Sequence, residues 1–213
     1  MLTPAFETPA FRDGFAELLR WRRDVRRFRP DPVPPALVTR LLEMAMLAPS
    51  VGLSQPWRFL LVESADRRAA IRREFEASNA EASRLYAGEQ AARYAALKLE
   101  GLREAPVHLA VCAARDPVAG HGLGRQTQPE TLRDSVVCAI HTIWLAARVE
   151  GLGLGWISIL RPAVAEAILD VPPGAELVAY LVLGWPEAAG EEPELAAAGW
   201  EQRQGLAAVL EMR

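Results

Sequence analysis

The 213-residue sequence has little cysteine, no signal-like N-terminus and no long uninterrupted apolar run. Its two cysteines, Cys112 and Cys138, lack CxxC spacing and a nearby histidine, which argues against a metal site or a redox motif. This usage favours a reducing, cytoplasmic compartment. The N-terminus has neither the basic nor the apolar region of a signal peptide. The most apolar stretch, residues 135–160, is interrupted by Arg148, Glu150 and three glycines, so we expect no membrane span.

An excess of positive charge is also missing. Lys and Arg total 24 against 27 Asp and Glu, and the net charge of -3 argues against a globally basic nucleic-acid binder. Lysine itself is nearly absent, because Lys98 is the single lysine and the other 23 basic residues are arginines. Six arginines nevertheless fall within residues 20–29, where Asp24 is the single acid. This local excess predicts a site for an anion.

The apolar pattern predicts long helices alternating with a few buried strands. We expect helices over 11–21, 36–48, 65–100 (broken near Gly88) and 132–150 and after Pro162, and strands over 57–62, 106–113, 154–160 and 177–184. This order predicts one three-layer α+β domain (α/β/α) that spans residues 1–213.

Three segments lie outside this regular pattern or have a special place in it. Residues 65–100 are expected to form a lid-like helical insertion, 116–129 a mobile loop, and 187–213 an acidic C-terminal extension. The helix expected over 132–150 is apolar nearly all round, which predicts that a second copy of the chain covers it.

The arginine-rich segment has the sequence Arg22-Arg23-Asp24-Val25-Arg26. A guanidinium group is always charged, and its planar fork matches the oxygens of a phosphate in pairs of hydrogen bonds. Several such groups on one turn suit a phosphate monoester. The alternatives are a solvated basic face or a nucleic-acid-binding arm, but an arm should carry lysines and exposed aromatic residues as well. The acid at the centre indicates a specific task or an arginine partner.

Two further segments carry possible site residues. The loop over 48–57 combines small residues, a hydroxyl and an amide, which would let its backbone approach a planar heterocycle; it could equally be an ordinary connection. The glycine-rich run over 151–155 follows a helix and precedes a strand, the reverse of a dinucleotide-binding fingerprint, so a Rossmann fold is rejected. Ser158 follows at the end of that strand, where most serines satisfy a backbone group.

Taken together and in this order, the three segments resemble the nitroreductase-like superfamily of FMN flavoproteins. That superfamily has an Arg-Arg-Ser-x-Arg-like motif, an Ala-Pro-Ser loop that ends in Gln-Pro-Trp, and Gly-Leu-Gly before a strand with Trp. The resemblance covers about residues 12–205. Asp24, where ordinary nitroreductases usually carry Ser, and Ser158 are similar to the flavin-destructase family within it.

This resemblance implies a fold, a reaction and partners. The fold would be a central, mostly antiparallel sheet flanked by helices, in a homodimer with an extended C-terminal tail. The reaction would be the oxygen-dependent fragmentation of reduced FMN to 5,6-dimethylbenzimidazole, the lower ligand of cobalamin, with release of a tetrose phosphate. Reduced FMN would be the substrate, dioxygen the co-substrate and a separate flavin reductase the source of reduced flavin.

The resemblance also implies roles for individual residues. Asp24 and Ser158 would be catalytic, with the neighbouring arginines favouring the charged form of Asp24 so that it acts as a general base. FMN would be bound by these two residues together with Arg22, Arg23, Val25, Arg26, Ser50, Leu99 and Arg203. Met46 departs from the family, in which a histidine often stands at this position, and no metal is expected.

Two other functions remain open from the sequence. The first is a conventional NAD(P)H-dependent nitroreductase or flavin reductase, against which Asp24 argues. The second is a non-catalytic module that binds a phosphorylated ligand or RNA through the arginines, against which the net charge of -3 argues. A steep salt dependence of RNA binding would support that module.

Overall fold

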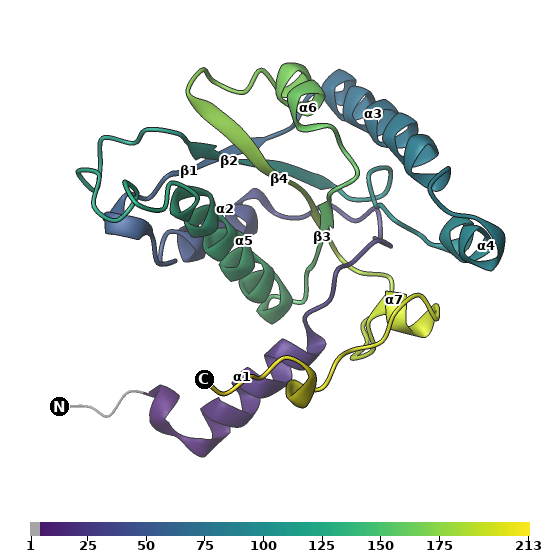
Figure 1. The fold of residues 1–213 in the computed structure, drawn as a ribbon, viewed down its shortest axis with the longest axis horizontal. Coiled ribbons are helices and arrows are strands. Elements are labelled where there is room, and N and C mark those ends of the chain that lie inside the picture. Colours follow the sequence, from purple (N-terminus) through teal and green to yellow (C-terminus); the bar gives the residue numbers. More distant parts are fainter. Residues whose placement is uncertain (1–4) are drawn as a thin grey trace.

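The computed structural model describes residues 5–213, and it places a four-stranded sheet between two layers of helices (Figure 1). The strands lie in the order β1-β2-β4-β3, and every neighbouring pair is antiparallel. Their bounds are β1 Trp57–Leu61, β2 Val107–Ala114, β3 Gly153–Ile157 and β4 Ala175–Gly184. The predicted three-layer α+β fold with an antiparallel sheet is confirmed.

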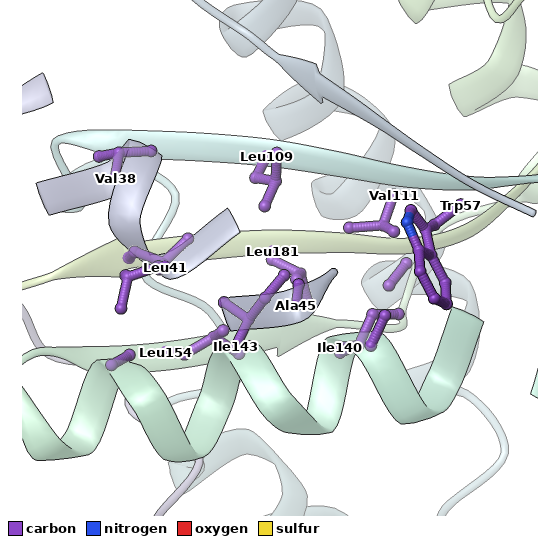
Figure 2. Close-up of a cluster of buried hydrophobic side chains, with 14 of the residues drawn as sticks. Val38, Leu41, Ala45, Trp57, Leu109, Val111, Ile140, Ile143, Leu154 and Leu181 are labelled. Atoms are coloured by element: carbon purple, nitrogen blue, oxygen red, sulfur yellow. The ribbon is translucent and has the colours of Figure 1, made fainter. Parts of the chain in front are cut away.

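Helices α2 (Pro35–Ala45) and α5 (Thr131–Val149) cover one face of the sheet. Figure 2 shows their apolar side chains directed at those of the strands, with Ile140 and Ile143 of α5 among them. Alternate residues of β4, such as Leu181, point to this face and are fully buried.

Helices α3 (Ala65–Ser83) and α6 (Pro162–Leu169) cover the opposite face. There Ile71 and Phe75 of α3 pack against Tyr180 and other residues of β4. Because both faces are covered, β2 and β4 are buried along most of their length, which explains why their sequences do not alternate between apolar and polar.

The remaining elements lie at the periphery. They are η1 (Ala5–Glu7), α1 (Pro9–Trp21), η2 (Val51–Leu53), α4 (Gly88–Ala96), α7 (Glu194–Ala197) and η3 (Leu206–Ala208). Figure 1 shows α1 and the C-terminal segment outside the three layers. Although α1 is amphipathic, none of its residues is buried. Within residues 5–213, no helix is long and apolar enough to cross a membrane.

The predicted elements are present, with shifted ends. The first helix over the sheet ends at Ala45 rather than Ala48, and β3 ends at Ile157, so Ser158 follows the strand. The segment over 65–100 contains α3 and α4 separated by residues 84–87, with no helix after Ala96. Residues 116–129 form turns.

Candidate active site

The arginine-rich segment runs beside β3, at the open edge of the sheet. The Val25 N–H donates to the Leu154 carbonyl at 2.9 Å, and Asp24 and Leu154 form a parallel bridge. Two residues further along β3, the Trp156 N–H donates to Oδ1 of Asp24 at 2.9 Å. The strand therefore fixes both the backbone and the carboxylate of the predicted motif.

The glycine-rich run exists because of this contact. A Cβ on Gly155 would lie 2.3 Å from the Val25 carbonyl oxygen, and one on Gly153 would lie 2.7 Å from a Val25 methyl carbon. Neither distance is sterically possible, so only glycine lets the segment approach β3 this closely. These glycines serve backbone packing, in agreement with the rejection of a dinucleotide fingerprint.

Asp24 is paired with Arg26 and lines a cavity. Arg26 donates from Nε at 3.0 Å and from Nη2 at 2.9 Å to Oδ2 of Asp24. Together with Arg23 and tail residues such as Glu192, Asp24 borders a cavity of about 230 Å³. The carboxyl group is thus held at one oxygen by an arginine and at the other by a backbone amide, beside a space that could admit part of a ligand.

Opposing effects act on the ionisation of Asp24. Burial raises its pKa above the ordinary aspartate value, although the charge of Arg26, the Trp156 N–H and the charge of Arg22 each lower it. The arginines favour the charged form, as the sequence predicts, but the loss of hydration outweighs them. A carboxyl group with a raised pKa exchanges protons closer to neutral pH, as acid–base chemistry requires.

Arg22, Arg23 and Arg203 lie close enough for their charges to act on one another, and Asp24 acts on Arg22. Burial lowers the pKa of Arg22, and the charge of Arg203 lowers it further against the opposing effect of Asp24. The pKa of Arg23 is lowered by burial and then by Arg203 and Arg22. Arg22 also lies over the ring of Trp144, 4.8 Å from its centroid. The predicted C-terminal arginine thus lies close enough to act on the other two, and an anion among them would relieve their repulsion.

Arg23 and Arg26 also hold neighbouring backbone. Arg23 donates from Nε to the Glu191 carbonyl at 2.7 Å, which fixes the tail. Arg26 donates from Nη1 to the Lys98 carbonyl at 3.0 Å, which fixes the residue before Leu99. Leu99 and Val25 are both half-buried against the core on the α3 and α6 side of the sheet. The predicted residues 22–26, Leu99 and Arg203 therefore form one neighbourhood.

The two predicted serines occupy different places. Ser158 is exposed, directly after β3 and two residues beyond the Trp156 amide that binds Asp24. Ser50 lies in the loop over 48–57, where its Oγ accepts from the Gln55 N–H at 3.1 Å. The next residue, Val51, is tied to Ser135 near the start of α5, whereas Trp144 beside Arg22 lies nine residues later, about 13 Å along the helix. Within one chain, Ser50 is thus separate from the arginines.

The loop around Ser50 has a backbone conformation that the sequence did not predict. Leu53 and Gln55 have φ angles of 54° and 43°, in the left-handed region that disfavours side chains. Strain of this kind clusters at ligand sites, so this loop keeps its candidate role. Beside it, Met46 accepts a hydrogen bond at Sδ from the Trp57 indole at 3.1 Å.

An aromatic cluster that the sequence did not reveal joins the tail to α4. Tyr86 and Tyr94 stack with ring centroids 4.6 Å apart, and Trp200 meets Tyr86 edge-on at 5.4 Å. Arg93 adds a hydrogen bond to the Gly199 carbonyl at 3.0 Å. An isolated tryptophan at position 200 is the one sequence signal that could have suggested this contact with Tyr86 and Tyr94. The segment that carries Arg203 is thereby attached to the helix after the break.

Comparison with known proteins identifies the family of this chain. The Nitroreductase family model matches residues 19–185. A 5,6-dimethylbenzimidazole synthase of Rhodospirillum rubrum is 54% identical, over 94% of this chain and 95% of its own length. One of Rhodobacter capsulatus is 51% identical, over 90% and 92%. The crystal structure of oxidized iodotyrosine deiodinase bound to FMN and 3-iodo-L-tyrosine is 27% identical, with a TM-score of 0.69 over 82% of this chain and 91% of that one.

The family match covers the segment from the end of α1 to the end of the sheet, and so includes Asp24, Ser158 and the glycine-rich strand. The two synthases extend the similarity to nearly the whole chain. The chain belongs to the nitroreductase family and, within it, groups with the 5,6-dimethylbenzimidazole synthases.

Proposed function

We propose that this protein is an oxygen-dependent enzyme that fragments reduced FMN to 5,6-dimethylbenzimidazole and releases a tetrose phosphate. The observation that carries the proposal is the position of Asp24, a carboxyl group of raised pKa held by Arg26 and the Trp156 N–H within reach of the charge of Arg22. Two relatives of at least 51% identity bear the name of this activity.

The arginines fit the phosphate of FMN. Arg22, Arg23 and Arg203 repel one another in the protein alone, and a phosphate dianion would neutralise them through paired hydrogen bonds. When bound, reduced FMN supplies the dimethylbenzene ring, the two nitrogens and the ring-closing carbon of the product, and dioxygen supplies the oxidising equivalents. Anchoring the phosphate would position the ribityl chain for cleavage.

Asp24 would move the proton at the ribityl carbon. Its Oδ1 is fixed by the rigid strand amide, whereas Oδ2 shares its charge with Arg26, so the group is oriented before the substrate arrives. Ser158 would orient the polar edge of the flavin ring, and Val25 and Leu99 would contact its apolar parts. The exposure of Ser158 leaves its hydroxyl available to a ligand.

A second copy of the chain would complete the site. Within residues 5–213, the apolar residues of α1 (Phe11, Phe15 and Leu19) and of the tail (Leu206, Val209 and Leu210) remain at least 40% exposed. An isolated 13-residue helix is marginal in water, so its apolar side needs a partner. On α5, Val137 and Val149 are also exposed. In such a homodimer, Ser50 of one copy would approach the arginines of the other.

Exclusion of water would come from the peripheral segments. Within the proposed insertion over 65–100, α3 is packed on α6, so we assign the movable part to α4 and the residues before it. The extension over 187–213 would follow α4, because Trp200 is packed on Tyr86 and Tyr94. Each turnover consumes its flavin, so a separate flavin reductase would supply reduced FMN.

The test is to mix the protein with reduced FMN in air and to follow the flavin absorbance. Fragmentation removes the flavin spectrum permanently, with the benzimidazole as product. A conventional NAD(P)H-dependent nitroreductase or flavin reductase would instead return oxidised FMN in full, and that result would overturn the proposal.

A further inference from the structure

Ser158 lies in a short irregular connection between β3 and α6. The strand ends at Ile157, which pairs with Tyr180 of β4, and α6 begins after its N-cap residue Arg161. The backbone of Ser158 is therefore positioned by two fixed points, one on each side. The first is the pairing of Ile157 with β4, and the second is Arg161 at the start of α6.

Arg161 is held by a carboxylate on α3. Glu74 accepts at Oε1 from the Arg161 backbone N–H at 3.1 Å and from Nε at 2.8 Å, and at Oε2 from Nη2 at 2.8 Å. Ser78 donates a further hydrogen bond to Oε1 at 2.9 Å. A carboxylate with four donors fixes both the side chain and the backbone of its partner.

Glu74 itself has little freedom to move. Its side chain is 5% exposed and lies beside Phe75, whose ring is buried in the core. The Arg161 hydrogen bonds lower the pKa of Glu74 to about 2, so the pair stays charged throughout the range in which an enzyme works. The pair is a permanent support, not a switch.

We propose that Glu74 is a positioning residue that fixes Ser158 through Arg161. The proposal depends on the role of Ser158 in the proposed function. Among the hydrogen bonds of the described residues, none joins Glu74 to Asp24 or to the arginines of the proposed phosphate site (Arg22, Arg23 and Arg203). Glu74 would therefore act on the geometry of the serine and not on phosphate binding.

The same two helices offer a matched control. Arg67 of α3 donates to the Leu169 carbonyl at 3.0 Å and pairs with Asp170 at the far end of α6. Asp170→Asn weakens the contact between α3 and α6 without touching residues 158–161. If any weakening of the contact between α3 and α6 slowed catalysis, Asp170→Asn would slow it as well.

The experiment measures fragmentation rates and anaerobic FMN affinity for Glu74→Gln, Asp170→Asn, Ser158→Ala and the Glu74→Gln/Ser158→Ala double variant. We expect Glu74→Gln to slow fragmentation about tenfold or more with FMN affinity within about twofold, and Asp170→Asn to change neither by more than about twofold. In the Ser158→Ala background, Glu74→Gln should have almost no further effect, because the group that it positions is gone.

Additive losses in the double variant would overturn the positioning role, as would equal losses in Glu74→Gln and Asp170→Asn. A wild-type rate in Ser158→Ala would instead refute the proposed role of Ser158 itself. If Glu74→Gln fails to fold, Arg161→Lys takes its place, because lysine keeps the charge but cannot make both side-chain hydrogen bonds. A crystal structure of Arg161→Lys would show whether Glu74 is released from residue 161. If Glu74 is released and the fragmentation rate is still that of the wild type, the proposal is contradicted.

Discussion

Asp24, in the arginine-rich segment, and Glu74, on α3, are both carboxylates that pair with an arginine. Glu74 accepts four hydrogen bonds and has a pKa of about 2. Asp24 accepts three, one from the Trp156 N–H and two from Arg26, and burial raises its pKa. The Glu74 side chain is 5% exposed and that of Asp24 is 30% exposed.

The two sites differ in which effect on the pKa is the largest. For Glu74 the hydrogen bonds from Arg161 outweigh the loss of hydration, whereas for Asp24 the loss of hydration outweighs Arg26 and the Trp156 N–H. The first arrangement supports structure, and the second leaves a carboxyl group that exchanges protons. The predictions below alter one side of this comparison at a time.

The largest effect is expected for Asp24→Asn. The amide keeps the shape and can still accept from the Trp156 N–H, but it cannot take up a proton, so fragmentation should fall at least about 100-fold. FMN affinity, measured anaerobically by fluorescence, should change less than about threefold. Asp31→Asn removes the acid of an exposed pair with Arg29 in the same arginine-rich stretch and should leave both values unchanged. Undiminished fragmentation in Asp24→Asn would remove this residue from the mechanism.

Gly155→Ala should displace Asp24 without changing its chemistry. The new methyl group would meet the Val25 carbonyl oxygen at 2.3 Å, so the segment must move away from β3. We expect about tenfold slower fragmentation and a free energy of unfolding lower by about 2 kcal/mol, measured by turnover and denaturant titration. Gly14→Ala in α1, where a Cβ meets nothing within 4 Å, is the control. If both variants behave alike, the close approach to β3 is not required.

Arg203→Ala tests the phosphate end of the site. Loss of one charge-assisted contact should weaken the binding of reduced FMN about tenfold, while the rate at saturation stays within about twofold. Arg213→Ala removes another arginine of the tail, one that pairs with Glu211, and serves as the control. An unchanged FMN affinity for Arg203→Ala would exclude Arg203 from the phosphate site.

The smallest expected effect is the change in Tm, and its direction at pH 7 should differ between Glu74→Gln and Asp24→Asn. At pH 7 Glu74→Gln should lower Tm, and the gap from the wild type should narrow below about pH 4.5, because the contribution of Glu74 is lost as pH falls toward its folded pKa of about 2. Asp24 has a raised pKa, so its favourable proton binding is lost as pH rises. Asp24→Asn should therefore equal or exceed the wild-type Tm at pH 7. Parallel Tm curves for the two variants would contradict the opposite pKa shifts.

The sequence predicted the layers well, since apolar periodicity and proline stops are local signals. The glycine-rich run and Ser158 could be placed at the start and just beyond the end of a strand because their spacing in the sequence is a local signal. The pairing of Glu74 with Arg161 could not be predicted, because the residues are 87 positions apart and no local pattern joins them. The raised pKa of Asp24 was also beyond reach, because hydration depends on which segments cover the carboxyl group.

The central claim is that Asp24 makes this site one that consumes its flavin. The most direct measurement mixes reduced FMN in air with equimolar wild-type protein or the Asp24→Asn variant and quantifies flavin and benzimidazole by mass spectrometry. We predict that the wild type converts flavin into 5,6-dimethylbenzimidazole in equal amounts, whereas Asp24→Asn returns oxidised FMN. Intact FMN recovered from the wild type, or equal benzimidazole from both, would contradict the claim.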